Sequence, residues 1–530
     1  MKRLLACFLL VCMLFSLVAC GGNTQKETQN EQNKTDSGAV DSSENVEKDE
    51  PMEITIAIPA EPSWLDPTKS IGEAGGYVSR GITEYLVAVG NNGTEYVPCL
   101  AESWEQGNGF WTVHLRQGVT FHNGEAFTAE DVIASFERMK NKEEPNIAST
   151  NLDAITEMEA LDDYTVKFVT EDTGFLNMLC NVGINPKDTL EEMGADAFSS
   201  APVGTGPYKF IEWVPGGYIK LEAYENYWGE KADIDIVNYR FIPEASTRVA
   251  ELVSGGVDVI TNLNPEYVNT INNSGIAYIA SKPSSRVVYY VFNRLDWGPE
   301  ELKDPRVCQA LNYAVNKQEI VDHILSGQGK VVANHWREDM EGYNPDVEPF
   351  PYDPEKAKEL LAEAGYPDGF TLTMQTSTGA FTQAVEVGQA IAGYLADVGV
   401  TVEIETLDYS TLRSYLIGGQ DLQKAAALCA TNYGGSAMDC TSMLGSIIRE
   451  NGVKTWYQSD TYHELVEGAL ASNDPEKRAE LLREFQAHLM EDPDAIYLYQ
   501  QMEIYGVNNR VIYEPEFGAS ISPYLMHPAE

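Results

Sequence analysis

The sequence predicts an α/β protein with more than one lobe. Residues 370–374 alternate apolar and polar side chains as a strand does, residues 384–395 place apolar side chains at helical spacing, and residues 400–404 alternate again. A strand, a crossover helix and a second strand predict a parallel pair of strands with helices covering the sheet. The chain has 530 residues, more than one hydrophobic core usually organises, so two or three lobes are expected.

The first residues have the pattern of a secretory signal. Lys2 and Arg3 precede an almost wholly apolar run over residues 4–18, which is shorter than the roughly 20 residues of a membrane span. Leu17-Val18-Ala19-Cys20 resembles the bacterial lipoprotein signal, in which the cysteine is acylated and becomes the mature first residue. We therefore expect a signal peptide over 1–19 and two acyl chains on Cys20, enough for stable membrane attachment. An ordinary secreted protein with a chance cysteine is the alternative.

Residues 20–51 are predicted to be a lipid-anchored disordered tether. They are rich in Asn, Gln, Thr, Ser, Glu and Lys and contain almost no large apolar side chain, so they cannot bury enough surface to fold. The whole chain has a formal net charge of −45. So acidic a protein repels phosphate backbones, which excludes nucleic acid as an expected partner.

The folded body is predicted to begin with a strand over 53–58, followed by a turn over 64–67. Trp111, Val113 and Leu115 alternate with polar residues and predict a half-buried strand. Asn123-Gly124 predicts a tight turn. Thr128 then opens a helix, with Asp131 completing a capping box. The predicted buried face of this helix consists of Val132, Ile133, Phe136 and Met139.

Three later helices are predicted to begin at Asp-Pro pairs, because Asp is a good N-cap and Pro suits the first turn. The pairs are Asp304-Pro305, Asp353-Pro354 and Asp474-Pro475. The second helix places four apolar residues on one face and is expected to end at Gly365. Those residues are Ala357, Leu360, Leu361 and Ala364.

The cysteines and histidines suggest neither a disulfide framework nor a metal site. After the signal and Cys20, five widely spaced cysteines remain, and no C-x-x-C motif occurs. A Cys429–Cys440 disulfide is left open, since the two cysteines could pair in an oxidising compartment. The seven histidines include no His-x-x-x-His pair. Binding of a nickel chelate through His335 is also left open.

The sequence contains no motif of a nucleotide-hydrolysing or serine-hydrolase enzyme. The G-x-x-x-x-G-K-[ST] loop is absent, as is the G-x-S-x-G nucleophile elbow. These absences predict that the chain does not hydrolyse ATP itself and has no serine-hydrolase site. No catalytic residue and no cofactor is predicted. An extracellular glycosidase that uses paired carboxylates is the alternative from a different class.

Short motifs then follow one another along the body of the chain. They are Leu65-Asp66-Pro67, Leu100-Ala101-Glu102-Ser103-Trp104, residues 111–124, Thr128-Ala129-Glu130-Asp131-Val132, residues 204–208, Tyr227-Trp228, Ser254-Gly255, Val257-Asp258, residues 304–307, residues 353–358 and Ala364-Gly365-Tyr366. Together they resemble the extracellular solute-binding proteins of family 5, the peptide- and nickel-type receptors of ATP-binding-cassette (ABC) importers. The resemblance covers about residues 52–525.

The resemblance implies a two-lobed clamp of the periplasmic-binding-protein type, in the large class that carries an extra domain in lobe I. Lobe I would take residues 52–87, 183–288 and 491–530, the inserted subdomain 88–182, and lobe II 289–490. The hinge would lie near 288–293 and near the end of the helix after Asp474. Ligands of such clamps lie between the lobes, and closure buries them.

A loop of lobe II commonly contacts the ligand in this family, and here it spans residues 428–444. Tyr433 and Asp439 match the family pattern, whereas Leu428 and Cys440 replace a Trp and a Pro. The carboxylate that pairs with a peptide's α-ammonium in peptide-binding members falls at Thr431 or Asn432. Another acid would then have to bind a free amine, such as Asp439 or Glu73, because an unpaired buried charge is costly.

Further candidate ligand-binding residues come from loops that face the ligand in the family. Trp64, Tyr77, Trp336 and Phe381 are candidate aromatic walls, and Arg413 is a candidate partner for a ligand carboxylate. Packing in a core is the alternative for each aromatic residue, and a solvated helix face is the alternative for Arg413. The full predicted set is Trp64, Tyr77, Trp336, Phe381, Arg413, Asn432, Tyr433 and Asp439.

These observations predict a substrate-binding lipoprotein of an ABC importer. It would act as a monomer outside the cytoplasmic membrane, anchored through Cys20, and deliver its solute to the permease and its ATPase subunits. An oligopeptide or dipeptide-like ligand is expected, with an oligosaccharide as the alternative. A further role in peptide sensing would use the same fold.

Overall fold

The computed structural model describes residues 51–69, 72–90, 93, 95–141, 152–171, 174–416, 421–434, 440, 443–444, 459–472, 474–515 and 521–529. All of them belong to one compact unit, Pro51–Glu530. The signal peptide, Cys20, the tether up to residue 50 and the candidate Asp439 lie outside the described residues, so those assignments stay predictions.

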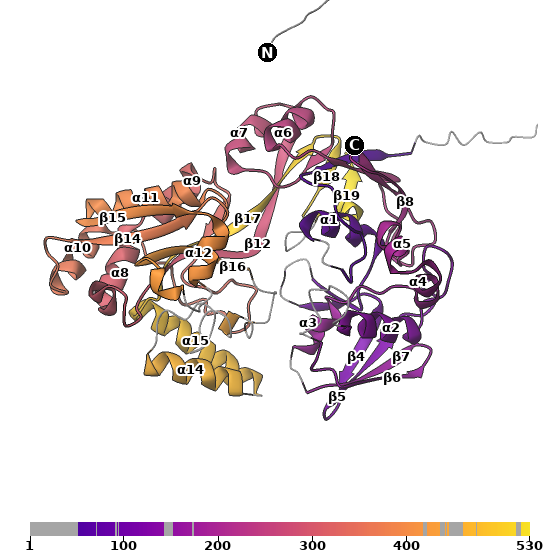
Figure 1. Cartoon of the computed structure of the whole chain (residues 1–530), viewed down its shortest axis with the longest axis horizontal. Helices are drawn as coiled ribbons and strands as arrows, with labels where there is room; N and C mark the ends of the chain where they lie inside the picture. The colour runs from indigo at the N-terminus through magenta and orange to yellow at the C-terminus, as the bar shows by residue number, and fades with distance from the viewer. Residues whose placement is uncertain are drawn as a thin grey trace, which may run out of the picture. The chain divides into compact units, whose positions relative to one another are not determined.

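The largest element is a mixed sheet of eleven strands, ordered β15-β14-β16-β12-β17-β11-β1-β10-β9-β8, with β13 also paired to β17. Figure 1 shows its two long strands, β12 and β17, side by side. The strands are β1 (Glu53–Ile58), β8 (Tyr208–Val214), β9 (Tyr218–Ala223), β10 (Ile236–Phe241), β11 (Val259–Ile260), β12 (Ala277–Phe292), β13 (Gly329–Val331), β14 (Phe370–Ser377), β15 (Val400–Leu407), β16 (Leu428–Gly434) and β17 (Ala495–Asn508).

Three smaller sheets accompany it. A four-stranded antiparallel sheet is ordered β4-β5-β7-β6, and two further pairs are β2-β3 and β18-β19. Their strands are β2 (Val87–Val89), β3 (Tyr96–Pro98), β4 (Ala101–Gln106), β5 (Phe110–Leu115), β6 (Glu157–Asp162), β7 (Thr165–Val169), β18 (Val511–Tyr513) and β19 (Met526–Pro528).

Helices cover these sheets. The described α-helices are α1 (Gly72–Ile82), α2 (Ala129–Lys140), α3 (Phe175–Leu179), α4 (Lys187–Met193), α5 (Ala195–Ser200), α6 (Ala245–Val253), α7 (Val268–Asn272), α8 (Pro305–Ala314), α9 (Lys317–His323), α10 (Pro354–Glu363), α11 (Ala384–Asp397), α12 (Tyr409–Leu416), α14 (Asp460–Ala471) and α15 (Pro475–Glu491). Short 3₁₀ turns are η1 (Pro265–Tyr267), η2 (Glu300–Lys303), η3 (Leu422–Lys424) and η5 (Pro523–Leu525). In Figure 1, α2 lies along the four-stranded sheet and α11 beside β14 and β15, as their contacts require.

Local sequence signals predict these elements well. The expected strand–helix–strand unit is β14, α11 and β15, and β14 pairs in parallel with β15 from Phe370–Val400 onward. The predicted half-buried strand is β5, in which buried and part-buried residues alternate. In α2 the capping box between Thr128 and Asp131 is present, but Ile133 lies only partly buried at the edge of the face.

All three Asp-Pro pairs begin helices, as predicted. Asp304 Oδ1 accepts a hydrogen bond from the Arg306 amide at 2.9 Å. The carboxylates of Asp353 and Asp474 do the same at the first turns of α10 and α15. Each side chain thus satisfies a backbone N–H that has no partner within the helix.

Within the described part of the chain, four clusters of buried apolar residues form the cores. The largest joins residues 287–499, and a second joins the four-stranded sheet to α2 and α3. The remaining two surround β1, β10 and the carboxyl-terminal half of β17. The domain boundaries implied by the family resemblance stay a prediction.

β12 and β17 pass from one core to another. Ala280 and Ile504 belong to cores around β1, whereas Val287 and Tyr499 belong to the largest core. The ladder between the strands is irregular from Pro283 to Val287. The change of core therefore lies at residues 281–286 of β12 and 500–503 of β17. The predicted hinge segment begins after this point, at residue 288, and its residues 288–292 belong to the largest core.

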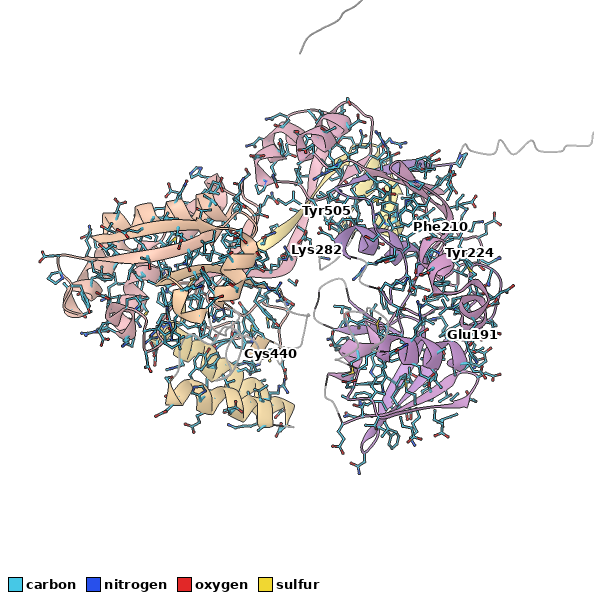
Figure 2. All side chains as sticks on the ribbon, viewed as in Figure 1. Glu191, Phe210, Tyr224, Lys282, Cys440 and Tyr505 are labelled. Carbon is cyan, nitrogen blue, oxygen red and sulfur yellow. The ribbon has the colours of Figure 1, made fainter. Side chains whose placement is uncertain are left out.

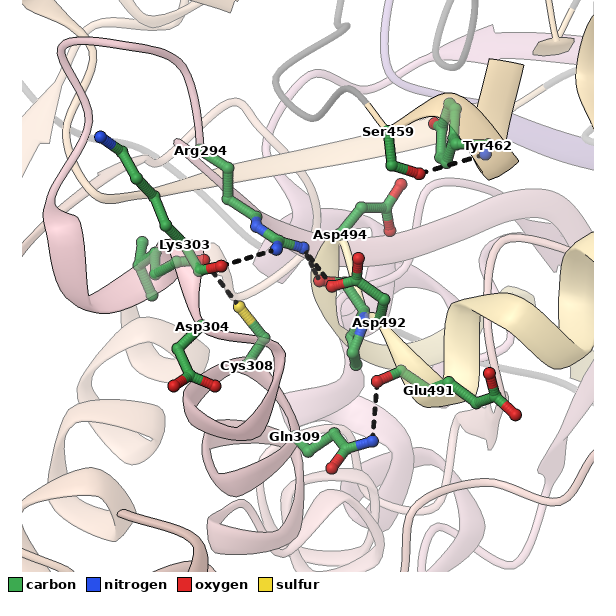
Figure 3. A network of polar contacts seen from close by, with 12 residues as sticks. Arg294, Lys303, Asp304, Cys308, Gln309, Ser459, Tyr462, Glu491, Asp492 and Asp494 are labelled. Atoms are coloured by element: carbon green, nitrogen blue, oxygen red, sulfur yellow. Dashed lines mark hydrogen bonds and ion pairs between the residues drawn. The ribbon is translucent and has the colours of Figure 1, made fainter. Parts of the chain in front are cut away.

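Polar contacts fix the end of α15, the second place where a hinge was predicted. Figure 3 shows Arg294 with its guanidinium against Asp492, at 2.6 Å between Nη1 and Oδ1. The same guanidinium donates to the carbonyl of Lys303, and Gln309 donates to the carbonyl of Glu491 at 2.8 Å. These contacts tie the end of α15 to the segment that leads into α8.

The five cysteines of the described residues are not joined in disulfides: Cys99, Cys180, Cys308, Cys429 and Cys440. The Cys429–Cys440 disulfide that the sequence left open is not formed. The Cys429 thiol donates to Gln375 Oε1 at 3.5 Å, and the Cys440 thiol donates to Glu341 Oε2 at 3.5 Å. The two sulfur atoms therefore face different partners.

Candidate functional site

A polar pocket of about 180 Å³ lies where β12 and β17 change cores. It draws residues from α1, from the segment before η1, from β12, from the segments after α9 and β14, and from β17. The lining residues are Glu73, Asn262, Leu263, Asn264, Pro265, Arg286, Leu325, Gln328, Thr382, Gln501, Met502, Glu503 and Ile504. We call it the strand-crossing pocket.

Asn262 holds one acidic wall of the strand-crossing pocket in place. Its backbone is left-handed, with φ of 50°, a conformation that asparagine tolerates better than most residues. Its amide donates to Glu73 Oε2 at 2.8 Å and accepts from the Tyr77 hydroxyl at 2.8 Å. The buried Arg248 guanidinium donates to the carbonyls of Thr261 and Asn262, at 3.2 and 2.9 Å. Glu73 is therefore held by a chain of fixed groups.

Tyr77 is buried behind this wall. Burial raises the pKa of its phenol, and the neighbouring Glu73 carboxylate raises it further. The phenol therefore remains protonated and continues to donate to Asn262. This predicted candidate lies next to the pocket but is not part of its lining.

Glu503 supplies a second carboxylate, from β17. Burial raises its pKa, the Arg286 guanidinium lowers it, and Glu73 raises it. Lys282 is the residue directly opposite Glu503 on β12, and Figure 2 labels it close to Tyr505 of β17. The carboxylates of Glu73 and Glu503 line the same pocket and repel each other electrostatically.

Arg286 brings a positive charge to the same pocket. It is exposed, and among the described residues its guanidinium has no hydrogen bond or ion pair with another side chain, apart from its electrostatic interaction with Glu503. Carboxylates are the groups that a guanidinium binds best, through two parallel hydrogen bonds. The pocket can therefore bind a ligand that carries charges of both signs.

Two glutamines add unused acceptors. The side-chain oxygens of Gln328 and Gln501 are buried and have no hydrogen-bond partner within the described part of the chain. Leaving a buried polar atom unpaired costs free energy. A ligand that donates hydrogen bonds to these oxygens would recover it.

The first part of the predicted ligand loop, Leu428–Gly434, is strand β16, which pairs with β12. Arg286 is opposite Gly434, Val287 opposite Tyr433 and Val288 opposite Asn432. The Asn432 amide donates to the carbonyl of Ala380, so it is engaged in a structural contact. Tyr433 is half-buried against the largest core. Neither lines the strand-crossing pocket.

The other predicted candidates are dispersed. Trp64 is 41% exposed, with Lys69 Nζ 5.0 Å from the centre of its ring. Arg413 is exposed on α12. Trp336 and Phe381 are buried in the largest core, where Trp336 packs against Phe485 and Phe381 against Tyr290. Their role in ligand binding stays a prediction, as does that of Asp439.

Sequence reasoning named Glu73 as a possible acid but missed Asn262, Arg286, Gln501 and Glu503. They come from three distant segments of the sequence, and only the fold brings these segments together. One available signal was Pro283 inside a segment otherwise rich in strand-forming residues, because proline within a sheet marks an edge or a bulge.

His335, named for a nickel chelate, is buried. Its Nε2 lies 2.9 and 3.0 Å from the two carboxylate oxygens of Asp494. Burial by itself would raise the pKa of the Asp494 carboxyl. Interaction with His335 outweighs burial and holds this pKa below its usual range. Among the described residues, no three His, Cys, Asp or Glu side chains are grouped closely enough to bind a metal ion.

No described helix has the length and apolar character needed to cross a membrane.

Comparison with known proteins identifies the family. The model of bacterial extracellular solute-binding proteins, family 5 (middle), matches residues 95–453. The chain is 29% identical to the dipeptide-binding protein of Escherichia coli over 445 residues, which is 76% of this chain and 81% of that protein. It is 30% identical to the glutathione-binding protein GsiB of Pectobacterium atrosepticum over 378 residues, which is 67% of this chain and 72% of that protein.

Solved structures show the same fold. The periplasmic binding protein DppA of Helicobacter pylori, solved with the peptide STSA, matches with a TM-score of 0.67 and 26% identity, over 91% of this chain and 99% of that chain. A protein of Haemophilus parasuis matches with a TM-score of 0.78 and 24% identity, over 90% and 100% of the two chains. The predicted fold class is thereby confirmed. The chain belongs to the bacterial extracellular solute-binding proteins of family 5 and is a non-catalytic substrate-binding protein of an ABC importer.

Proposed function

We propose that the solute of this protein is a peptide-like zwitterion bound in the strand-crossing pocket. Its ammonium group binds between Glu73 and Glu503, and its carboxylate binds Arg286. The observation that carries the proposal is one pocket that contains two carboxylates and a guanidinium for which the described residues provide no ion-pair partner. Charge pairs removed from water in this way give selectivity, because a wrong ligand leaves a charge unpaired.

The relatives support a peptide-like solute. The two proteins compared above are named for dipeptides and for glutathione, and the Helicobacter pylori structure contains the peptide STSA. In peptide-binding members a carboxylate falls at the position of Thr431 or Asn432 here. Glu73 and Glu503 offer the negative charge from other elements, so a free amine can still be paired.

Isothermal titration calorimetry with one tripeptide in three forms tests this assignment. The free peptide is expected to bind, and the N-acetylated and C-amidated forms are each expected to bind about ten- to hundredfold more weakly, as loss of a charged hydrogen bond implies. Glu73→Gln should reduce the penalty for N-acetylation, because only Glu503 then faces the ammonium group. Glu355→Gln, on the exposed face of α10, is the matched control. Equal binding of all three forms would contradict the proposal.

An oligosaccharide is the second candidate. The unpartnered oxygens of Gln328 and Gln501 can accept from sugar hydroxyls, and the exposed Trp64 offers a ring for stacking. A panel of saccharides in the same calorimeter separates the two candidates. Saccharide binding that is unaffected by Glu73→Gln would favour this reading over the peptide.

Membrane attachment belongs to the same proposal. Residues 1–19 are removed, Cys20 is acylated, and residues 20–51 tether a monomeric receptor, divided into the lobes that the resemblance implies, to the membrane that holds its permease and ATPase subunits. An anchor of this kind keeps the receptor concentrated at the transporter. Mass spectrometry of the mature amino terminus should find diacylated Cys20, and Cys20→Ala should release the protein from the membrane fraction. An unmodified Cys20 would contradict this part of the proposal.

A further inference from the structure

We infer that Arg337 and Gln500 are positioning residues, which aim Arg286 into the strand-crossing pocket. The inference rests on the proposed function, in which Arg286 binds the carboxylate of the solute. Neither Arg337 nor Gln500 lines that pocket; both line a different one, of about 430 Å³. Any effect they have on the solute must therefore pass through another group.

The backbone before Arg286 is irregular. Pro283 pairs with Met502 and Val287 with Gln500, so three residues of β12 stand opposite a single residue of β17. Such a bulge re-aims the side chains of the strand. It also removes ladder hydrogen bonds, so the carbonyl groups within it need other donors.

Two side chains supply those donors. The Gln500 amide donates to the carbonyl of Ser284 at 2.7 Å. The Arg337 guanidinium donates to the carbonyl of Ser285 at 2.8 Å. The Ser284 hydroxyl in turn accepts from the backbone N–H of Arg286 at 3.0 Å. The two residues immediately before Arg286 are thus fixed by side chains from two other segments of the chain.

Arg337 is itself rigidly held. Its side chain is fully buried, and Asp339 accepts from Nε at 3.0 Å and from Nη2 at 2.8 Å. The remaining Nη1 is the atom that donates to Ser285. Lysine has no planar group that can bind a carboxylate with two hydrogen bonds and a carbonyl with a third. The position therefore needs arginine for this geometry.

The bulge decides where Arg286 points, because little else holds its side chain. The guanidinium has no hydrogen bond within the described residues, and its stem lies over Gly434 of β16. A Cβ atom on Gly434 would lie 3.0 Å from Arg286 Cγ and 3.4 Å from Ser285 Oγ. The stem of Arg286 thus packs against the Gly434 backbone, which has no side chain, and Arg286 lines the pocket together with Glu503 and Gln501.

The test measures carboxylate discrimination, defined as the affinity for a free tripeptide divided by that for its C-terminal amide. The mature full-length protein is titrated by calorimetry with both peptides. Arg286→Ala is expected to abolish discrimination. Arg337→Lys and Gln500→Leu are each expected to reduce it about tenfold, with little effect on the amide, because one charged contact is misplaced. In the Arg286→Ala background, Arg337→Lys should have no further effect.

Arg294→Lys is the matched control. It alters a buried arginine that pairs with Asp492, away from the pocket, so it should lower the melting temperature and leave discrimination unchanged. If Arg337→Lys does not fold, Gln500→Leu carries the test. Intact discrimination in both variants, or equal weakening of both peptides, would overturn the inference while leaving the role of Arg286 standing. Intact discrimination in Arg286→Ala would refute the proposed function itself.

Discussion

Lys317 is a buried cation without an acidic partner. Its side chain is 4% exposed, and Nζ donates to the carbonyls of Asn312 and Phe350 at 2.7 and 3.2 Å. Within the described residues no carboxylate pairs with it. Burial lowers the pKa of this lysine to about 7, because the charged form is poorly solvated inside the protein.

The protein should therefore gain stability as pH rises above neutral. Between pH 7 and about 10.5 the unfolded chain binds more protons at Lys317 than the folded chain does, so the free energy of unfolding increases with pH. Below about pH 7 both states are protonated and the full cost of the buried charge is present. A pKa difference of one corresponds to about 1.36 kcal/mol, so the gain between pH 7 and 9 is about 2 kcal/mol.

Urea unfolding of the wild type and of Lys317→Met at pH 7 and pH 9 measures this gain. Methionine cannot titrate, so the stability of the wild type relative to the variant should rise by about 2 kcal/mol between the two pH values. Other titrating groups are shared and cancel in the comparison. Lys356→Met, at an exposed ion pair with Glu359 on α10, is the control and should follow the wild type. Parallel pH dependence of the wild type and Lys317→Met would refute the reasoning.

Four further measurements follow from the contacts of single residues. Asp66→Asn should lower unfolding stability by about 3–5 kcal/mol in a urea titration, because it removes the buried ion pair in which the Arg138 guanidinium lies 2.6 Å from the Asp66 carboxylate. Asp353→Ala should lower the free energy of unfolding by about 1 kcal/mol, since the cap of α10 is lost. An unchanged urea midpoint of the variant protein would show that the cap is unimportant. Burial raises the pKa of the Cys308 thiol to about 12, so iodoacetamide at pH 8 should label it only after unfolding, and labelling of the native protein would contradict this. Burial also raises the pKa of Glu503, so peptide affinity should fall between pH 7 and pH 5 in the wild type and less in Glu503→Gln, as calorimetry at both pH values would show.

Local chemistry made much of the fold predictable. The strand–helix–strand unit over 370–407 follows from a change of apolar period between neighbouring segments, and the helix starts at Asp304, Asp353 and Asp474 follow from a side chain that caps its own first turn. These signals lie within a few residues of the elements they define. Family motifs then supplied the arrangement that local signals alone could not.

The candidate site was less predictable, because long-range pairing forms it. Nothing near residue 286 in the sequence reveals that Glu503 lies across the strand pair, or that Glu73 is held by an asparagine almost 190 residues further along the chain. The aromatic candidates illustrate the converse difficulty. Trp336 is 2% exposed and packs against Phe485, and composition alone does not distinguish such a core residue from the wall of a binding pocket.

The position of the strand-crossing pocket has a physical reason. Residues 281–286 and 500–503 lie where β12 and β17 leave one hydrophobic core for another, and polar side chains such as Arg337 and Gln500 help to fix them. Arg286 is exposed, so its guanidinium can lack a hydrogen-bonding partner among the described residues at little cost, because water reaches it. Glu503 is more buried, and burial raises the pKa of its carboxyl. When a solute replaces that water, the same groups find their partners in the ligand. The place where β12 and β17 change cores is thus suited to exchange solvent for a charged solute.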